Sequence, residues 1–298
     1  MELLGVESGD FGDEAIDVPM AAPEVYDDAQ QTAINTVGDR KAIITRETGS
    51  LSVRDRFLIV QGQGSFQHIP LLAIGSMEHR QETEDLLVYP VGAQLGPLMR
   101  MPLDRPSANQ VIPILWKEIR RVRASVQADY PDGLTVSEEE LRREAQAFHE
   151  RSVTVHGFWR RDDRQSVLLD IVWLTPPRSM PRWPPTIAHV AVTGTWLADG
   201  MAYGPEENFN ASLEARAIDP APVPNPTPTT LPELRQRCPD RATVRVRGPL
   251  VGAGQGLRFA SFSAVLAHPE LAAAVVPGKP VEVVAYIERQ VFYIQEIR

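Results

Sequence analysis

The chain has 298 residues, 43% of them hydrophobic and 23% charged, a composition typical of a globular protein with two or three domains. It contains no run of about 18 apolar residues, no signal-peptide pattern at its N-terminus, and one cysteine, Cys238, which excludes an intrachain disulfide framework. We therefore expect a cytoplasmic protein without a membrane span.

The net charge of −9 is concentrated at one end of the chain. Residues 1–41 hold ten acidic residues against Arg40 and Lys41, so this segment alone carries a net charge of −8. High acidity without a regular hydrophobic period predicts a disordered tail. Single apolar residues alternate with acids at residues 10–19, so the tail is either a docking motif for a basic groove or a solubilising segment. The nearly neutral remainder does not exclude a nucleic-acid partner.

Residues 42–130 are predicted to form a β domain closed by a helix. Short alternating runs predict strands at 42–46, 50–54, 57–61, 66–70 and 86–92, and apolar residues recur at helical spacing over 106–127. On the runs at 49–60, 69–74 and 86–89 and the helix that follows, this region of about 85 residues resembles bacterial pleckstrin-homology-like (PH-like) domains. The resemblance implies a binding or assembly module without catalytic chemistry.

The predicted helix carries a cluster of basic residues. The cluster is either a surface for phosphates or an acidic partner, or the solvated side of the helix near its negative end. Its members are Lys117, Arg120, Arg121 and Arg123.

The second half of the chain contains one pattern used twice. The motif V-x-V-x-G occurs at residues 153–157, 190–194 and 244–248, and a related run without the glycine begins at Val281. In both pairs the second run starts 37 residues after the first, and a third apolar run lies between them, at 167–174 and 257–262. Alternation followed by glycine predicts strongly coiled strands. These beginnings are similar to those of oligonucleotide/oligosaccharide-binding (OB) folds, which implies two small five-stranded barrels.

The first of these units is predicted at residues 131–210, with a connector helix that starts at a capping box formed by Ser137 and Glu140. OB modules stack bases on aromatic rings, and Trp159, Trp173, Trp183 and Trp196 all lie in this unit. Trp173 and Trp196 share the parity of core residues, so we expect them to be buried.

Trp183 lies in a proline-rich loop at residues 175–185, next to Arg182 and near Arg178. Prolines exclude a central strand and favour an extended loop. Trp183 therefore either is exposed, with the two arginines, to stack on a base or enter an aromatic groove, or folds back to plug an open barrel end.

Alternating prolines predict a stiff linker at residues 211–234, followed by the second unit at 235–298. Arg245 and Arg247 share the outward side of its first strand, and Arg258 follows a glycine-rich loop. Two arginines at this spacing suit a phosphate track as well as an ordinary solvated strand face.

No catalytic or metal-binding motif is present. The six histidines and the single cysteine show no ligand spacing, and there is no nucleophile elbow or Walker loop, so we predict no catalytic residue, metal or cofactor. We expect a mainly β protein with a few helices, made of a PH-like β domain and two small OB-like β-barrels. The predicted function is a non-catalytic adaptor that binds protein partners. The alternative is a single-stranded nucleic-acid-binding protein whose acidic tail competes for the groove. The third hypothesis is a hydrolase whose carboxylates are assembled in space from distant parts of the chain, an arrangement that sequence spacing does not reveal.

Overall fold

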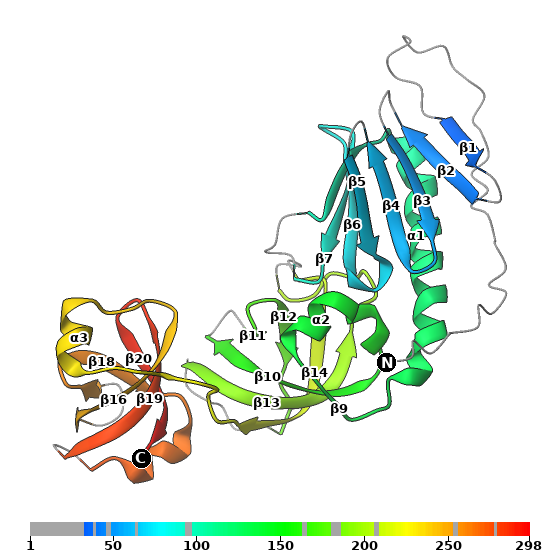
Figure 1. The fold of residues 1–298 in the computed structure, drawn as a ribbon. Coiled ribbons are helices and arrows are strands. Elements are labelled where there is room, and N and C mark those ends of the chain that lie inside the picture. Colours follow the sequence, from blue (N-terminus) through cyan, green and yellow to red (C-terminus); the bar gives the residue numbers. More distant parts are fainter. Residues whose placement is uncertain are drawn as a thin grey trace, which may run out of the picture.

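A computed structural model describes residues 33–37, 40–45, 49–62, 65–92, 97–162, 166–179, 186–205, 209–252, 256–276 and 279–298, with side chains from residue 51 onward except 61–66. The prediction of a mainly β protein built from barrel units is confirmed. Three units follow one another along the chain: an N-terminal β domain with a long helix, a first barrel and a C-terminal barrel (Figure 1).

The N-terminal domain consists of two antiparallel sheets and helix α1 (Arg105–Val126). The five strands of the first sheet are neighbours in sequence order, and a short 3-10 turn at Leu71–Ala73 leads to the three strands of the second. The first sheet contains β1 (Ala33–Val37), β2 (Arg40–Thr45), β3 (Gly49–Arg54), β4 (Phe57–Gly62) and β5 (Ser65–Pro70), and the second β6 (Ile74–Arg80), β7 (Asp85–Pro90) and β8 (Met99–Pro102).

The five predicted strands correspond to β2, β3, β4, β5 and β7, and three further strands were missed. β1 lies inside the segment predicted to be a disordered tail, so regular structure begins before residue 42; residues 1–32 lie outside the described part of the chain. β6 carries a mostly polar sequence, and β8 alternates over only four residues and ends at Pro102, which is why the pattern did not reveal them.

Helix α1 begins at an N-cap, Asp104, whose side chain accepts a hydrogen bond from the Ser107 backbone N–H at 2.8 Å. Pro106 occupies the first turn, where its missing N–H costs nothing, and Pro113 lies on an exposed position inside the helix. One stripe of α1 is buried against both sheets, and it includes Val111, Leu115, Ile119, Val122 and Val126. The predicted helix at 106–127 is therefore present.

The first barrel closes through the strand order β10-β11-β12-β14-β13, with β13 pairing back to β10. All neighbours are antiparallel except β12 and β14, which are parallel. Its strands are β10 (Ser152–Arg161), β11 (Ser166–Leu168), β12 (Val172–Thr175), β13 (Thr186–Leu197) and β14 (Ser212–Pro220).

The C-terminal barrel repeats this order as β16-β17-β18-β20-β19, again with one parallel pair, β18 and β20. A 3-10 segment at Pro269–Ala274 connects β18 to β19. Its strands are β16 (Ala242–Val251), β17 (Arg258–Phe259), β18 (Phe262–Leu266), β19 (Pro280–Glu288) and β20 (Val291–Ile297).

The repeated unit is larger than the valine motif indicated. In each unit a short strand, β9 (Leu134–Val136) or β15 (Thr227–Pro228), pairs parallel with the first barrel strand. A helix with a complete capping box follows, α2 (Glu138–Glu144) behind Ser137 and α3 (Leu231–Gln236) behind Thr230. Each helix buries one leucine in the core of its own barrel. Strand, capped helix and barrel are thus duplicated together.

The predicted linker at 211–234 overlaps this architecture. β14 forms the last strand of the first barrel, and α3 with β15 belongs to the C-terminal unit, so the connection between the barrels is shorter than predicted. Residues 211–219 contain no proline. The proline pattern that starts at Pro220 was therefore extended too far towards the N-terminus.

The valine motifs pair with one another. Residues 153–157 lie antiparallel to 190–194, so that Val153 is opposite Gly194 and Gly157 opposite Val190. Gly194 lies at a bulge between β13 and β14, where an added Cβ would be 2.3 Å from the Glu214 carbonyl oxygen. The C-terminal barrel has its bulge at the equivalent position, with Ala285 in place of glycine. The register thus explains both the 37-residue step and the glycine at position 194.

Buried amide side chains join the N-terminal domain to the first barrel. Gln146 donates to the Ile74 carbonyl at 2.8 Å, and Asn210 donates to the Pro90 carbonyl at 2.8 Å while accepting from the Gly92 N–H at 2.9 Å. Both amides are almost fully buried, and an unmade hydrogen bond there would cost about 1–3 kcal/mol. These contacts fix the two units in one orientation.

Candidate interaction surfaces

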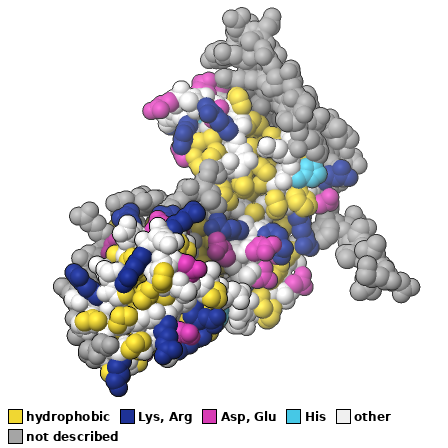
Figure 2. All heavy atoms as spheres, turned by 60° about the vertical axis from the view of Figure 1, so that its left-hand side comes forward, with side chains coloured by type: hydrophobic (Ala, Val, Ile, Leu, Met, Phe, Trp, Pro, Cys, Tyr) yellow, Lys and Arg dark blue, Asp and Glu magenta, His cyan; other side chains and the backbone are white. Residues whose placement is uncertain are grey.

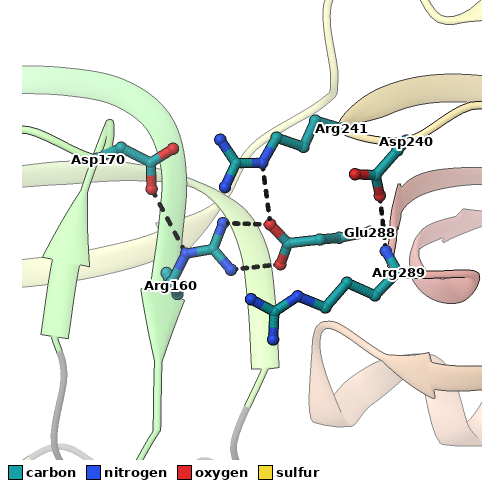
Figure 3. Close-up of polar contacts among 6 residues, drawn as sticks. All are labelled: Arg160, Asp170, Asp240, Arg241, Glu288 and Arg289. Carbon is teal, nitrogen blue, oxygen red and sulfur yellow. Dashed lines mark hydrogen bonds and ion pairs between the residues drawn. The ribbon is translucent and has the colours of Figure 1, made fainter.

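The junction between the two barrels is built around a carboxylate, Glu288, at the end of β19. Arg160 of β10 contacts both carboxylate oxygens, and its second hydrogen bond is 3.0 Å long (Figure 3). Arg241 approaches the same carboxylate at 3.5 Å, and Asp170 lies 3.4 Å from the Arg160 Nε. Glu288 is only 7% exposed. The pair is therefore a buried, bidentate connection between the two barrels, formed by residues that are 128 positions apart in the sequence.

A second set of contacts lies beside this ion pair. The Gln295 side chain on β20 accepts from the His189 backbone N–H and donates to the Ile187 carbonyl, both at 2.8 Å. The Phe158 ring lies 5.0 Å from the His189 ring and 4.6 Å from the Tyr286 ring. The outward side of β19 and β20 therefore covers the end of β10 and the start of β13.

Burial and charge at this junction shift several pKa values. The hydrogen bonds from Arg160 hold the pKa of Glu288 below its ordinary value, and the same pairing raises the pKa of Arg160. Burial lowers the pKa values of His189 and His268 and raises those of Tyr286 and Tyr293. His156 adds a like-charge effect to His189 and Glu296 an opposite one. The junction therefore favours neutral histidines and an ionised Glu288.

The outward side of β16 forms a second candidate surface. Val244, Val246 and Leu250 point into the core, so Arg245, Arg247 and Val251 face outward. Arg258 on β17 lies directly opposite Val251. We call the four outward residues Arg245, Arg247, Val251 and Arg258 the β16 face. Val251 is 47% exposed, and within the described residues the side chains of the three arginines form no ion pair.

The acids of the C-terminal unit are mostly engaged elsewhere. Glu288 is held in the junction, Glu296 pairs with Arg298 at 2.5 Å, and Asp240 accepts from the Arg289 backbone N–H at 2.7 Å. Glu282, opposite Arg247 in the register, is the acid nearest the β16 face along the strands. Lys and Arg side chains are spread over the barrel that comes forward in Figure 2, with hydrophobic side chains between them. The described surface of this barrel is therefore locally basic.

The structure groups some of the predicted site residues and separates others. It places Arg245, Arg247 and Arg258 on one face, whereas Arg178 is exposed in the loop after β12; Arg182 and Trp183 lie outside the described residues. On α1, Lys117, Arg120 and Arg121 are exposed on one side, and Arg121 pairs with Glu118 at 2.9 Å. Arg123 lies 3.4 Å from the Gln146 side chain at the junction with the first barrel, so it does not extend that surface.

The described tryptophans serve packing. Trp159 and Trp196 are fully buried in the first barrel, as parity predicted for Trp196. The parity prediction was wrong for Trp173, because its neighbours Val172 and Leu174 are the core residues of β12 and Trp173 is only half-buried, with its ring 5.8 Å from that of Phe209. Trp116 on α1 packs where a side chain at Gly200 would lie. None of these four described rings is displayed as an open stacking platform.

Sequence reasoning missed the residues that connect the barrels. Glu288, Gln295 and His189 are buried polar residues, yet each lies in a strand whose alternation indicated nothing unusual. Val251 was missed because an apolar residue at the end of a strand is normally predicted to be buried in the core. The repeat was the available signal, because an alignment of residues 153–160 with residues 244–251 makes Val251 the sequence equivalent of Arg160.

Among the described residues, no group of three or more His, Cys, Asp or Glu side chains is placed to hold a metal ion, and no helix is long and apolar enough to cross a membrane. Comparisons of the chain with protein-family models, with curated proteins and with solved structures gave no match.

Proposed function

We propose that this protein is a non-catalytic binding scaffold, an adaptor that acts through protein–protein contacts. The observation that carries the proposal is that buried polar side chains lock three β units together, through Gln146 and Asn210 at one junction and Glu288 and Gln295 at the other. Units joined in this way present separate exposed surfaces on one molecule, which is what a scaffold requires. The two-sheet domain closed by α1 supports the PH-like interpretation of its N-terminal part.

The chemistry of the described residues supports binding over catalysis. Three groups with shifted pKa values, His149, His189 and Glu288, lie at the junctions between units, where burial or ion pairing accounts for each shift. Catalytic groups with shifted pKa values would be expected to converge on a cleft.

The test is a pull-down with three full-length forms of the protein as baits at one salt concentration. The baits are wild type, Arg247→Glu/Arg258→Glu, and Arg120→Glu/Arg178→Glu. Both variants change the net charge equally but alter different exposed surfaces. We expect the wild-type bait to retain a defined polypeptide, and we expect one of the two variants to retain at least about tenfold less of it. Equal retention of all polypeptides by all three baits would contradict a specific scaffold.

A second candidate, single-stranded nucleic-acid binding, is favoured by the three arginines of the β16 face and by the OB-like strand order of both barrels. Fluorescence anisotropy of labelled single-stranded DNA and RNA at low and moderate salt tests it. Steeply salt-dependent binding that Arg247→Glu/Arg258→Glu removes would favour this candidate. The absence of binding at low salt would exclude it.

A further inference from the structure

The repeat assigns an interface role to equivalent faces of the two barrels. The first barrel uses the outward residues of its first strand, Phe158 and Arg160, to receive the C-terminal barrel. By position after the valine motif, the equivalents in the C-terminal barrel are Pro249 and Val251. Among the described residues no unit packs on this face, and Val251 is 47% exposed.

The open face has a definite chemistry. Arg245, Arg247 and Val251 lie along one side of β16 over about 20 Å, since a strand rises about 3.3 Å per residue. Arg258 stands across from Val251, and Lys279 precedes Pro280, which pairs with Pro249. Glu282 lies opposite Arg247, but the three arginine side chains form no ion pair within the described residues. An exposed apolar side chain among such cations suits an acidic segment with interspersed apolar residues.

The chain contains such a segment. Residues 1–32 hold nine acids and no lysine or arginine, and Phe11, Ile16 and Val18 alternate with acids within residues 10–19. Thirty-two residues can span up to about 105 Å when extended, and the pattern at residues 10–19 lies 14 to 23 residues from Ala33, which gives it a reach of roughly 45–75 Å. A tethered partner also acts at a high effective concentration, so a modest affinity suffices for occupancy.

We propose that the β16 face is the docking surface of the chain's own N-terminal segment, residues 1–32. The segment neutralises the arginines of this face and covers Val251. An acidic partner or a nucleic acid would then have to displace it. This inference does not depend on the identity of any partner of the scaffold.

The test uses zero-length carbodiimide coupling, which joins carboxylates to lysines, on the full-length protein. The chain has three lysines: Lys279 beside the β16 face, Lys117 on α1 and Lys41 close in sequence to the segment. We expect cross-links from the segment to Lys279, at a yield that does not depend on protein concentration and falls in high salt. Lys41 serves as the positive control and Lys117 as the control for unspecific contact.

The variant Arg247→Glu/Arg258→Glu should lower the Lys279 cross-link about tenfold, whereas Arg120→Glu/Arg178→Glu should leave it unchanged. Circular dichroism verifies folding, and Val251→Asp, a single change at an exposed position, replaces the double variant if that fails to fold. Equal cross-linking to Lys117 and Lys279 would overturn the proposal. So would cross-links that form only between different copies of the chain, which would assign the face to a second copy. An oligonucleotide that binds the face without reducing a Lys279 cross-link would also overturn it.

Discussion

The two barrels share strand order, capped helix and bulge, yet they differ in what covers them. The first barrel contacts the N-terminal domain through Asn210 and Gln146 and the C-terminal barrel through Arg160 and His189. Within the described residues, the C-terminal barrel contacts one neighbour and leaves its β16 face open. Equivalent surfaces of one repeated fold have therefore become an interface in the first case and an exposed basic face in the second.

The largest expected difference between the barrels concerns the bulge. Gly194→Ala would place a Cβ 2.3 Å from a backbone oxygen, so we expect it to lower the free energy of unfolding of the first barrel by about 3 kcal/mol. The matched change Ala285→Gly should cost only about 1 kcal/mol in the C-terminal barrel.

Urea unfolding followed by tryptophan fluorescence measures the first effect, because all five tryptophans precede residue 197, and far-ultraviolet circular dichroism follows both barrels. Similar small losses in both variants would show that the bulge of the first barrel relaxes and that the two bulges are interchangeable.

The junction provides the next effect. Glu288→Gln removes the bidentate carboxylate from Arg160, which keeps only the longer contact to Asp170, and should destabilise the barrel pair by about 2 kcal/mol at pH 7. The control Glu296→Gln removes an exposed pair with Arg298 and should cost less than about 1 kcal/mol.

The pH dependence gives a further check on the same pair. Because the pKa of Glu288 is lowered in the fold, its contribution is fully present above about pH 4.3 and is lost as the pH falls through the lowered pKa. The difference between wild type and Glu288→Gln should therefore shrink in acid. A difference that stays constant down to pH 3 would contradict the role of the ion pair.

The capped helices should behave alike. Ser137→Ala and Thr230→Ala each remove the side chain that accepts from the third helical N–H, and each should cost about 1 kcal/mol. Thermal unfolding of the two variants measures the losses. A clear loss in one variant and none in the other would show that only one of the helices contributes to its barrel.

The smallest expected effect is the response of His189 to pH. Burial lowers its pKa, so the unfolded chain binds the proton first and stability decreases as the pH falls below the unfolded value of about 6.5. At pH 6 one such histidine contributes a loss of at most about 0.8 kcal/mol. Replacing it in His189→Gln should reduce the loss of stability between pH 7.5 and 6. An unchanged pH dependence would assign the loss to other groups such as His149 and His268.

Local sequence pattern predicted most strands and helices of the fold but few of the contacts that join the three units. The motif at 153–157 and its echoes predicted the barrel strands, and Ser137 with Glu140 predicted the first capped helix, because both depend on neighbours in sequence. Asn210 and Gln146 gave no signal, since their partners are backbone atoms 120 and 72 residues away. Arg245 and Arg247 were predicted to share one face, and Arg258 was a candidate without that placement. The importance of Val251 required knowing which face of the first barrel is covered.

The junction between the barrels is head-to-tail, because β19 and β20 of one unit meet β10 and β13 of the other. An arrangement of this kind does not close on itself, so identical units could be added without limit, as in a filament. The positions equivalent to Arg160 and Glu288 are Val251 in the C-terminal barrel and Leu197 in the first. A second copy therefore cannot form the same ion pair at the open end.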